Sequence, residues 1–336
     1  MSDLLRVGIV GAGMIGGCHS RAYAATPGVE VAGIWDRRGP KAEALAATTG
    51  ATVVADLDAL LDLGIDVVSV CTPPDSHVSI ALQALDAGCH VMCEKPVALD
   101  LDDARRLRAA ARDAEAAGQV VAIGHVSRFE ADHAAARRLV ADGLIGQVAM
   151  MSHSITTPFP AWSEDGWLAD PSRSGGPLLD LAVHSFDYLA WVSGGPAVRV
   201  HAVAGDTPVG PDTYALVTVR YENQAMGQVQ VSWANPASRG FRLACELVGT
   251  QGRLSWDYGS ISTGELHRSD GSSEVFDPLG ERGYAAELSA FTEAARAGGP
   301  SPVPVEAGYQ ALRTALAARR SLDTGQPVDL TSWEVA

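Results

Sequence analysis

The chain has 336 residues and a formal net charge of −15, and 47% of its residues are hydrophobic. This length favours two domains, and the composition can fill a sizeable core in each. The acidic balance argues against nucleic acid or an anionic membrane as a partner, because both require clustered Lys and Arg.

The N-terminus and the cysteines indicate where the protein works. "MSDLLRVGIVGAG" enters a predicted strand at once and shows no basic region, long apolar stretch or cleavage site typical of export. The sequence contains no run of the ~20 apolar residues that a membrane helix needs. The five cysteines are odd in number and lie among apolar neighbours, as reduced, buried thiols do. We therefore expect a cytoplasmic protein without a membrane anchor.

Cys89, His90 and Cys93 raise the alternative of a metal site. They lie in "CHVMCEKP", which predicts a short buried strand. Residues four apart on a strand share a face but lie too far apart for one ion. We therefore expect no metal.

Residues 1–124 predict a first domain of alternating strands and helices. The predicted strands are apolar throughout, which is typical of parallel strands covered on both faces. The pattern predicts an α/β, doubly wound parallel sheet of the Rossmann type. Its predicted strands are "LRVGIVG", "VEVAGIWD", "ATVV", "DVVSVCT", "HVMCEKP" and "QVVAIGH", and its predicted helices span 14–25, 40–49, 56–61, 77–87 and 101–117.

The first predicted turn carries "GAGMIG", with Gly11, Gly13 and Gly16. The motif follows a predicted strand and opens a predicted helix, at Met14 and Ile15. Such glycines let the backbone approach a pyrophosphate, and the helix N-terminus offers N–H groups to it. A tight turn without a ligand is the alternative, but the strand-to-helix context favours dinucleotide binding.

Asp36 ends the second predicted strand, twenty positions after Gly16. An acid at this place accepts hydrogen bonds from a ribose 2′-hydroxyl and repels a 2′-phosphate, so it favours NAD. Arg37 and Arg38 follow at once and could hold that phosphate instead, so NADP stays an alternative.

Two later strand ends lie where ligands bind in such sheets, beyond the carboxyl ends of the strands. One is "CTPPDSH", in which Cys71, Thr72, Pro73 and His77 are candidate cofactor contacts.

The other strand end is Glu94–Lys95–Pro96. A lysine directly after a buried strand projects from the sheet edge, whereas the alternative is a solvated surface lysine. Pro96 restricts the backbone, and a cis bond before it would aim Lys95. We count Glu94 and Lys95 among the cofactor-binding residues.

Residues 125–336 predict a second, α+β domain with a large, mostly antiparallel sheet, because several runs alternate apolar and polar residues. We expect one face of this sheet to pack on helices and the open face, with Val, Leu and Trp, to form a homodimer or homotetramer. The last helices belong here or pack back on the first domain. The predicted strands are "QVAMMSHSI", "AVRVHAVAG", "TYALVTVRY", "AMGQVQVSW", "FRLACELVGT" and "GRLSWDY", and the predicted helices span 129–142, 178–191, 283–297 and 308–324.

The predicted helix "LLDLAVHSFDYLAW" has an unusual polar stripe. Asp180, His184 and Asp187 share one face of an otherwise apolar helix. Burying such groups is costly unless they are paired or line a cavity, so we expect the stripe to face a catalytic cleft.

These motifs resemble the glucose–fructose oxidoreductase / inositol dehydrogenase family (Gfo/Idh/MocA) over nearly the whole chain. The most specific features are Glu94–Lys95–Pro96 and the D-x-x-x-H pair Asp180 and His184. The other features of the match are "GAGMIG", "CTPPDSH", "GHVSRF", "GWLADPSRSGGPLLDLAVHSFDYLAW" and the C-terminal "YAAELSAFTEAARAG" and "SLDTGQPVDL".

The resemblance implies an NAD(P)-dependent dehydrogenase acting on CH–OH groups. It would transfer a hydride between the cofactor and a secondary alcohol or ketone of a sugar, cyclitol or related polyol. It also implies that Lys95, Asp180 and His184 are catalytic. His184 suits a general acid/base because its usual pKa is near neutrality. Asp180 would orient its imidazole, and Lys95 would hydrogen-bond the reacting oxygen.

Other residues are candidates for substrate binding. Asp187 and His153 could hydrogen-bond further substrate hydroxyls, although a core histidine is an equal reading of His153. Trp162 and Tyr284 could stack on a sugar, or else pack in the core. Ser127 stands where cyclitol dehydrogenases of the family often carry the first Arg of "RRF" or "RRY", so the compound stays open.

Two other functions remain as alternatives. Some relatives of this fold are NAD-dependent glycosidases, which oxidise, eliminate, hydrate and re-reduce without net cofactor turnover. At least one relative is a non-catalytic co-repressor, but such a sensor predicts damaged catalytic residues, and Lys95, Asp180 and His184 are all present.

Overall fold

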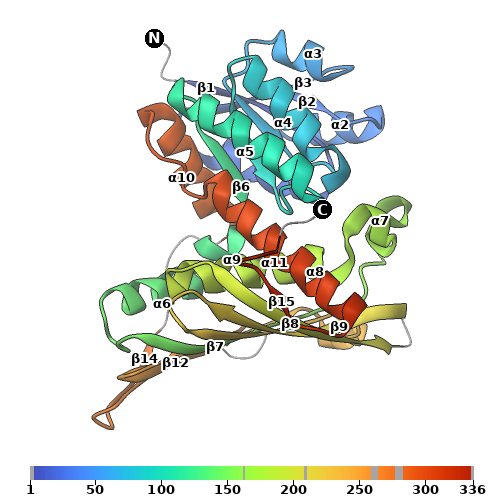
Figure 1. Ribbon diagram of the computed structural model, residues 1–336. Coiled ribbons are helices and arrows are strands. Elements are labelled where there is room, and N and C mark those ends of the chain that lie inside the picture. The colour runs from blue at the N-terminus through green and yellow to red at the C-terminus, as the bar shows by residue number, and fades with distance from the viewer. Residues whose placement is uncertain (1–3, 162, 208–209, 259–263, 277–282, 334–336) are drawn as a thin grey trace. The chain divides into compact units, whose positions relative to one another are not determined.

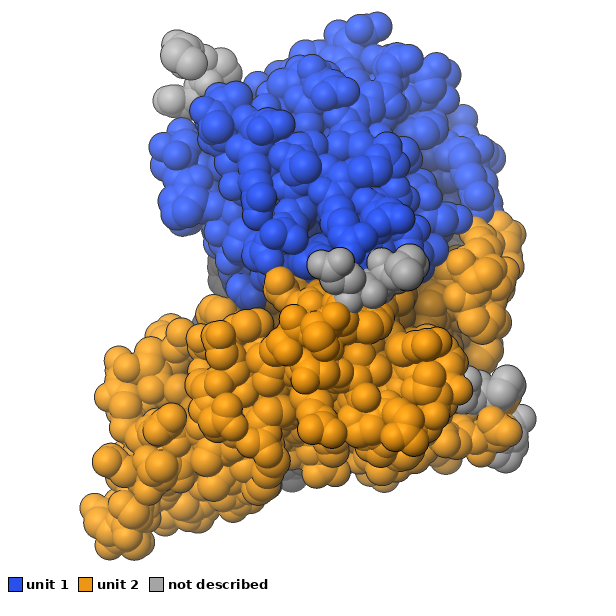
Figure 2. Space-filling model, viewed as in Figure 1, with its two compact units in different colours: residues 1–129, 281–309 blue, residues 130–280, 310–336 orange. Residues whose placement is uncertain are grey.

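The computed structural model describes residues 4–161, 163–207, 210–258, 264–276 and 283–333. The chain divides into two compact units (Figure 2). Unit 1 comprises residues Met1–Phe129 and Glu281–Tyr309, and unit 2 comprises Glu130–Gly280 and Gln310–Ala336. The predicted boundary at 124/125 therefore lies close to the first division, but residues 281–309 return to unit 1.

Unit 1 is a doubly wound α/β unit, as predicted. Its six-stranded sheet has the order β3-β2-β1-β4-β5-β6, and every pair is parallel (Figure 1). The strands are β1 Leu5–Val10, β2 Val29–Trp35, β3 Thr52–Val53, β4 Val67–Val70, β5 His90–Glu94 and β6 Val121–Gly124. β4 and β6 are buried along their whole length, so neither strand has a solvent-exposed face.

Helices cover the sheet of unit 1. They are α1 Met14–Ala25, α2 Gly39–Ala46, α3 Leu57–Leu61, α4 His77–Asp86, α5 Leu101–Ala116 and α10 Tyr284–Ala297. Helix α1 packs against α10, and α4 packs against α5. Leu288 and Phe291 of α10 join the core formed by β1 and β2. Helix α10, from the last sixth of the chain, thus completes a core that began at the N-terminus. The short helices η1 Pro74–Ser76 and η2 Val126–Phe129 belong to the same unit.

Unit 2 contains a nine-stranded sheet with the order β14-β13-β12-β11-β7-β10-β9-β8-β15. Its pairs are antiparallel except β7 with β10, which are parallel. The strands are β7 Val148–Thr156, β8 Ala197–Thr207, β9 Gly210–Tyr221, β10 Met226–Ser232, β11 Arg242–Gly249, β12 Gly252–Tyr258, β13 Gly264–Arg268, β14 Ser273–Phe276 and β15 Val328–Asp329. The predicted mostly antiparallel sheet is confirmed, and β13, β14 and β15 are strands that the sequence did not indicate.

The two faces of this sheet differ, as the alternation predicted. On β7, Met151, His153 and Ile155 are buried, whereas Ser152 and Ser154 point to the other face. Helices α8 and α9 contact strands of the sheet. The remaining elements are α6 Ala131–Ala141, α7 Pro171–Ser174, α8 Gly176–Asp180, α9 Ala182–Ser193, η3 Glu164–Ala169 and η4 Ala237–Arg239, and helix α11 Val305–Thr324 crosses the division at residue 309.

The predicted helix over 178–191 is two helices. Helix α8 ends at Asp180, and α9 begins at Ala182, with Leu181 between them at φ −99° and ψ −48°. The amide of Leu181 still donates to Pro177, but the amide of His184 donates to Leu181, three residues back, at 3.2 Å. The two helices are therefore separated by a single turn that is wound more tightly than an α-helix.

No helix in the described ranges is long and apolar enough to cross a membrane. All five cysteines are free thiols, with Cys18 half-buried and the other four buried.

Candidate active site

The turn after β1 and the first turn of α1 hold the three glycines of the predicted dinucleotide site, with Gly11 and Gly13 in the turn and Gly16 in the helix. Gly11 has a φ of +99°, and a Cβ there would lie 2.7 Å from the carbonyl oxygen of Cys71. A Cβ on Gly16 would lie 1.9 Å from the carbonyl oxygen of Gly11, so α1 packs directly on the turn. Both positions therefore require glycine.

Gly13 differs from the other two glycines. It caps the N-terminus of α1 without a side chain, and a Cβ there would meet no described atom within 4 Å. The first N–H groups of a helix have no acceptor within the helix, and they attract anions. Open space beside these groups fits the pyrophosphate of NAD, with Met14 and Ile15 in the first turn of the helix.

Asp36, directly after β2, is tied to the glycine turn. Its Oδ2 accepts the N–H of Ala12 at 2.7 Å, and its Oδ1 accepts the N–H of Arg38 at 2.8 Å. A carboxylate has further lone pairs, so it can still accept a ribose hydroxyl. Asp36 therefore shapes the dinucleotide site and also offers it an acceptor.

His77 links the turns that follow β4 and β5. Its Nε2 lies 2.8 Å from the carbonyl oxygen of Thr72, and its Nδ1 lies 2.9 Å from that of Pro96. Burial lowers the pKa of His77, so the neutral ring donates to one of these two oxygens. Only 1% of His77 is exposed. This arrangement favours a role for His77 in joining the two turns over the predicted cofactor contact. Thr72 and Pro73, in contrast, are half-exposed and so remain open to a cofactor.

Lys95 is the first residue after β5, and the bond between Lys95 and Pro96 is cis. Its side chain is half-buried, whereas Glu94 is buried. Oε2 of Glu94 accepts the backbone N–H of Lys95 at 3.1 Å. The carboxylate thus supports the backbone that carries the lysine, and its burial favours this role over the predicted cofactor contact.

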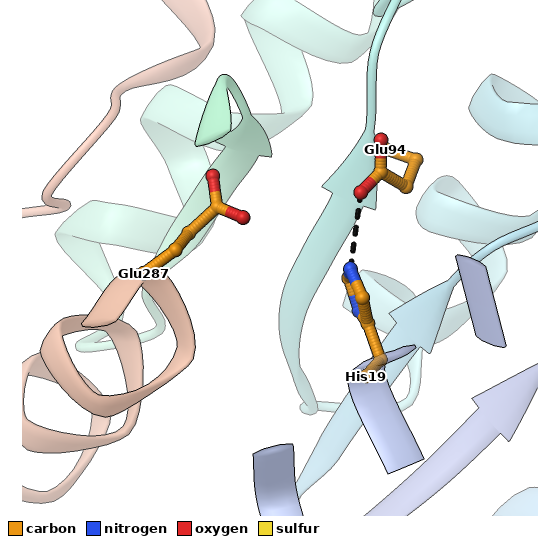
Figure 3. A group of neighbouring side chains, drawn as sticks. All are labelled: His19, Glu94 and Glu287. Atoms are coloured by element: carbon orange, nitrogen blue, oxygen red, sulfur yellow. Dashed lines mark hydrogen bonds and ion pairs between the residues drawn. The ribbon is translucent and has the colours of Figure 1, made fainter. Parts of the chain in front are cut away.

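Glu94 also pairs with His19, a residue on the buried face of α1 (Figure 3). Nε2 of His19 lies 3.0 Å from Oε1 of Glu94, and Nδ1 lies 2.8 Å from Oγ of Ser69. Burial alone would lower the pKa of His19, but Cys71 and Glu94 raise it well above its usual value. Burial alone would raise the pKa of Glu94, but the bond to His19 lowers it. Both directions indicate an ion pair.

Glu287 of α10 points toward the same pair (Figure 3). Within the described residues, His19, Glu94 and Glu287 are the group that could hold a metal ion, with ligand atoms within 4.8 Å of one another. Cys89 and Cys93 are not part of it. An ion would require His19 to lose the proton that its contact with Glu94 stabilises.

In unit 2, the predicted stripe separates into two kinds of residue. Asp180 and His184 are half-exposed, although the helices that carry them are mostly buried. Asp187 is only 2% exposed. The first two can therefore meet a ligand, and Asp187 is the member least open to a substrate.

His153 belongs to a buried chain of hydrogen bonds in unit 2. Its Nε2 lies 3.1 Å from Nε2 of His133, and its Nδ1 lies 2.8 Å from Oγ of Ser185. Nδ1 of His133 in turn lies 2.9 Å from Asp132. Burial and His133 lower the pKa of His153 well below its usual value, so the ring is neutral. These contacts favour the core reading of His153 over substrate binding.

The other candidate substrate residues lie in different places. Tyr284 begins α10 and packs on His19 with ring centroids 5.4 Å apart, so it belongs to unit 1. Ser127 lies in η2 of the same unit and is 6% exposed. Trp162 lies outside the described residues.

Sequence reasoning overlooked His19, Ser69 and Ser185. His19 contacts the predicted residue Glu94, Ser69 contacts His19, and Ser185 contacts the predicted residue His153. The signal for His19 was present, because it lies three residues after Gly16 on the helix face that covers the sheet. No such signal marks Ser69 or Ser185.

The parallel sheet, its glycine turn and the acid after β2 define a dinucleotide-binding protein. Residues 5–125 match a family described as "Oxidoreductase family, NAD-binding Rossmann fold", and residues 133–255 match the "GFO/IDH/MocA C-terminal domain". The chain belongs to the Gfo/Idh/MocA family.

Similar proteins agree with this assignment. Inositol 2-dehydrogenase of Rhizobium meliloti is 29% identical, over 95% of this chain and 97% of its own. The 1,5-anhydro-D-fructose reductase of Ensifer adhaerens is 31% identical over 84% of each. The crystal structure of GenD2 from gentamicin A biosynthesis in complex with NAD has a TM-score of 0.84 and 28% identity, covering 97% of this chain and 96% of its own. The predicted NAD(P)-dependent dehydrogenase of CH–OH groups is thereby confirmed.

Proposed function

We propose that the protein transfers a hydride between NAD and a secondary alcohol or ketone of a sugar, cyclitol or related polyol. The names of the inositol and anhydrofructose relatives support this class of compound. The observation that carries the proposal is the half-exposed pair Asp180 and His184 on otherwise buried helices. Ionisable groups in such surroundings are typical of sites that handle protons.

The roles follow from the chemistry of the side chains. His184 takes the hydroxyl proton during oxidation and returns it during reduction. Asp180, one turn earlier, orients the imidazole and stabilises its charged form. Lys95 donates a hydrogen bond to the reacting oxygen and stabilises its negative charge. The bound NAD supplies the hydride acceptor, and Gly11, Gly13, Gly16 and Asp36 hold it.

The proposal is tested by following reduced nicotinamide while NAD is mixed with a panel of sugars and cyclitols. We expect turnover with at least one polyol and its loss in His184→Ala. Cleavage of glycosides without net NAD reduction would instead show the glycosidase chemistry. NAD binding without turnover of any polyol or glycoside would contradict the proposal.

We further propose that a second copy packs on the open face of the nine-stranded sheet. Met150, Met226 and Val203 are 48%, 47% and 51% exposed, and Met150 and Met226 are neighbours in register on β7 and β10. Exposed apolar residues on a sheet are typical of oligomer surfaces. Light scattering should show a dimer or tetramer that Met226→Lys weakens; a monomeric wild type would contradict this. Free thiols support a cytoplasmic location.

A further inference from the structure

Three buried polar side chains lie behind Lys95, and each comes from a different element of unit 1. They are His19 of α1, Ser69 of β4 and Glu94 of β5. His19 and Ser69 are 0% exposed and Glu94 is 4% exposed. All three are shielded from bulk solvent, and their hydrogen bonds join them to one another and to the backbone of Lys95, with Cys71 and Glu287 as further neighbours.

The contacts link the three side chains to the backbone of Lys95. Nδ1 of His19 lies 2.8 Å from Oγ of Ser69, and its Nε2 lies 3.0 Å from Oε1 of Glu94. The other carboxylate oxygen, Oε2, accepts the N–H of Lys95 at 3.1 Å. Glu94 accepts from Nε2 of His19 and from the N–H of Lys95, so both oxygens of this buried carboxylate are hydrogen-bonded.

We propose that His19 is a positioning residue for Lys95. Its Nε2 holds the Glu94 carboxylate, and this carboxylate holds the backbone amide of the residue from which the lysine side chain projects. The inference rests on the proposed role of Lys95 in catalysis. It adds that this role depends on a residue of α1, 76 positions away in the sequence.

The space around Glu94 supports this reading. A Cβ on Gly124, its partner in register on β6, would lie 2.9 Å from both Cδ and Oε1 of Glu94. The carboxylate therefore occupies a slot that only glycine leaves open. Gly124→Ala displaces the carboxylate without removing a single charged group, which gives a second way to disturb the same support.

The main experiment is a double-mutant cycle between His19→Asn and Lys95→Ala. Asn retains a polar group near Nδ1 but cannot reach Glu94. We expect His19→Asn to lower kcat by roughly tenfold or more, because small misplacements of a reacting group are costly. In the Lys95→Ala background, where product is measured after long incubation, we expect the same substitution to lower kcat no further.

Matched variants separate positioning from loss of fold. His19→Gln keeps an N–H near Nε2, so it should recover part of the kcat that His19→Asn loses. Gly124→Ala should lower kcat as His19→Asn does. His90→Asn, at the start of β5, makes the same change at a half-exposed residue and should leave kcat unchanged. NAD affinity, measured by fluorescence titration, should stay within about twofold of wild type in all of them, since the loss concerns orientation rather than binding.

The outcomes are distinguishable. If Lys95→Ala keeps the wild-type kcat, the proposed function of Lys95 fails. If Lys95→Ala loses activity while His19→Asn and Gly124→Ala retain it, the positioning role is wrong. Equal losses from His19→Asn with and without Lys95 would also overturn it, because the effect would not pass through the lysine. So would a stoichiometric divalent ion that metal analysis finds in wild type and not in His19→Asn.

Discussion

The carboxylate of Asp36 accepts the N–H of Ala12 at 2.7 Å, which joins the end of β2 to the glycine turn after β1. One residue therefore shapes the turn and also offers an acceptor to a ribose. Its neighbours Arg37 and Arg38 are the cations nearest to it in the sequence. This arrangement makes cofactor preference testable at a single position.

Asp36→Ser should relax the preference for NAD over NADP. The substitution removes the charge that repels a 2′-phosphate, and the two arginines then favour that phosphate. NAD affinity should fall at the same time, because the support of Ala12 is weakened. The ratio of kcat/KM for the two cofactors measures the effect, and an unchanged ratio would mean that Arg37 and Arg38 already set the preference.

Substitution of Gly13 should weaken NAD binding, whereas substitution of Gly16 should lower the thermal stability of the protein. Gly13→Val places a side chain in the open space at the N-terminus of α1, so NAD affinity should fall by roughly tenfold or more while Tm changes little. Gly16→Ala drives a Cβ into the carbonyl oxygen of Gly11, so Tm should fall. Calorimetry and NAD titration on both variants check this, and a large loss of Tm in Gly13→Val would contradict the assignment of that space.

His19 and His153 should titrate in opposite directions from the usual value of 6.5. Because folding raises the pKa of His19, its contribution to stability is present below about 6.5 and is lost as the pH rises through the folded pKa. Because folding lowers the pKa of His153, its contribution is present above about 6.5 and is lost as the pH falls.

NMR of histidine-labelled protein measures both values, with His19→Asn and His153→Asn assigning the signals. We expect His19 to stay protonated at neutral pH and His153 to stay neutral well below it. A neutral His19 at pH 6 would contradict the ion pair between His19 and Glu94.

Much of the fold was predictable because hydrophobic periodicity reports which faces are buried. Helix α1 has the predicted bounds, and both sheets were expected. The hairpin of β13 and β14 was missed because "GELHR" and "SEVF" are short and mostly polar. The break at Leu181 was missed because it is a change in hydrogen bonding within a run that is apolar throughout.

The site was predictable only where a motif is local. The glycine turn and Glu94–Lys95–Pro96 are contiguous in the sequence, so their spacing could be read directly. The partnership of His19 with Glu94 joins residues 75 positions apart, and the chain of His133, His153 and Ser185 joins three elements. Such pairings depend on tertiary packing, which one sequence does not display.

The central claim is that Lys95 and His184 carry out chemistry on a substrate that NAD oxidises. Its most direct test is the single-turnover rate of hydride transfer in Lys95→Ala and His184→Ala, measured beside their affinities for NAD. We expect each rate to fall by roughly a hundredfold or more while NAD affinity stays within about twofold of wild type. A near wild-type rate in either variant would contradict it.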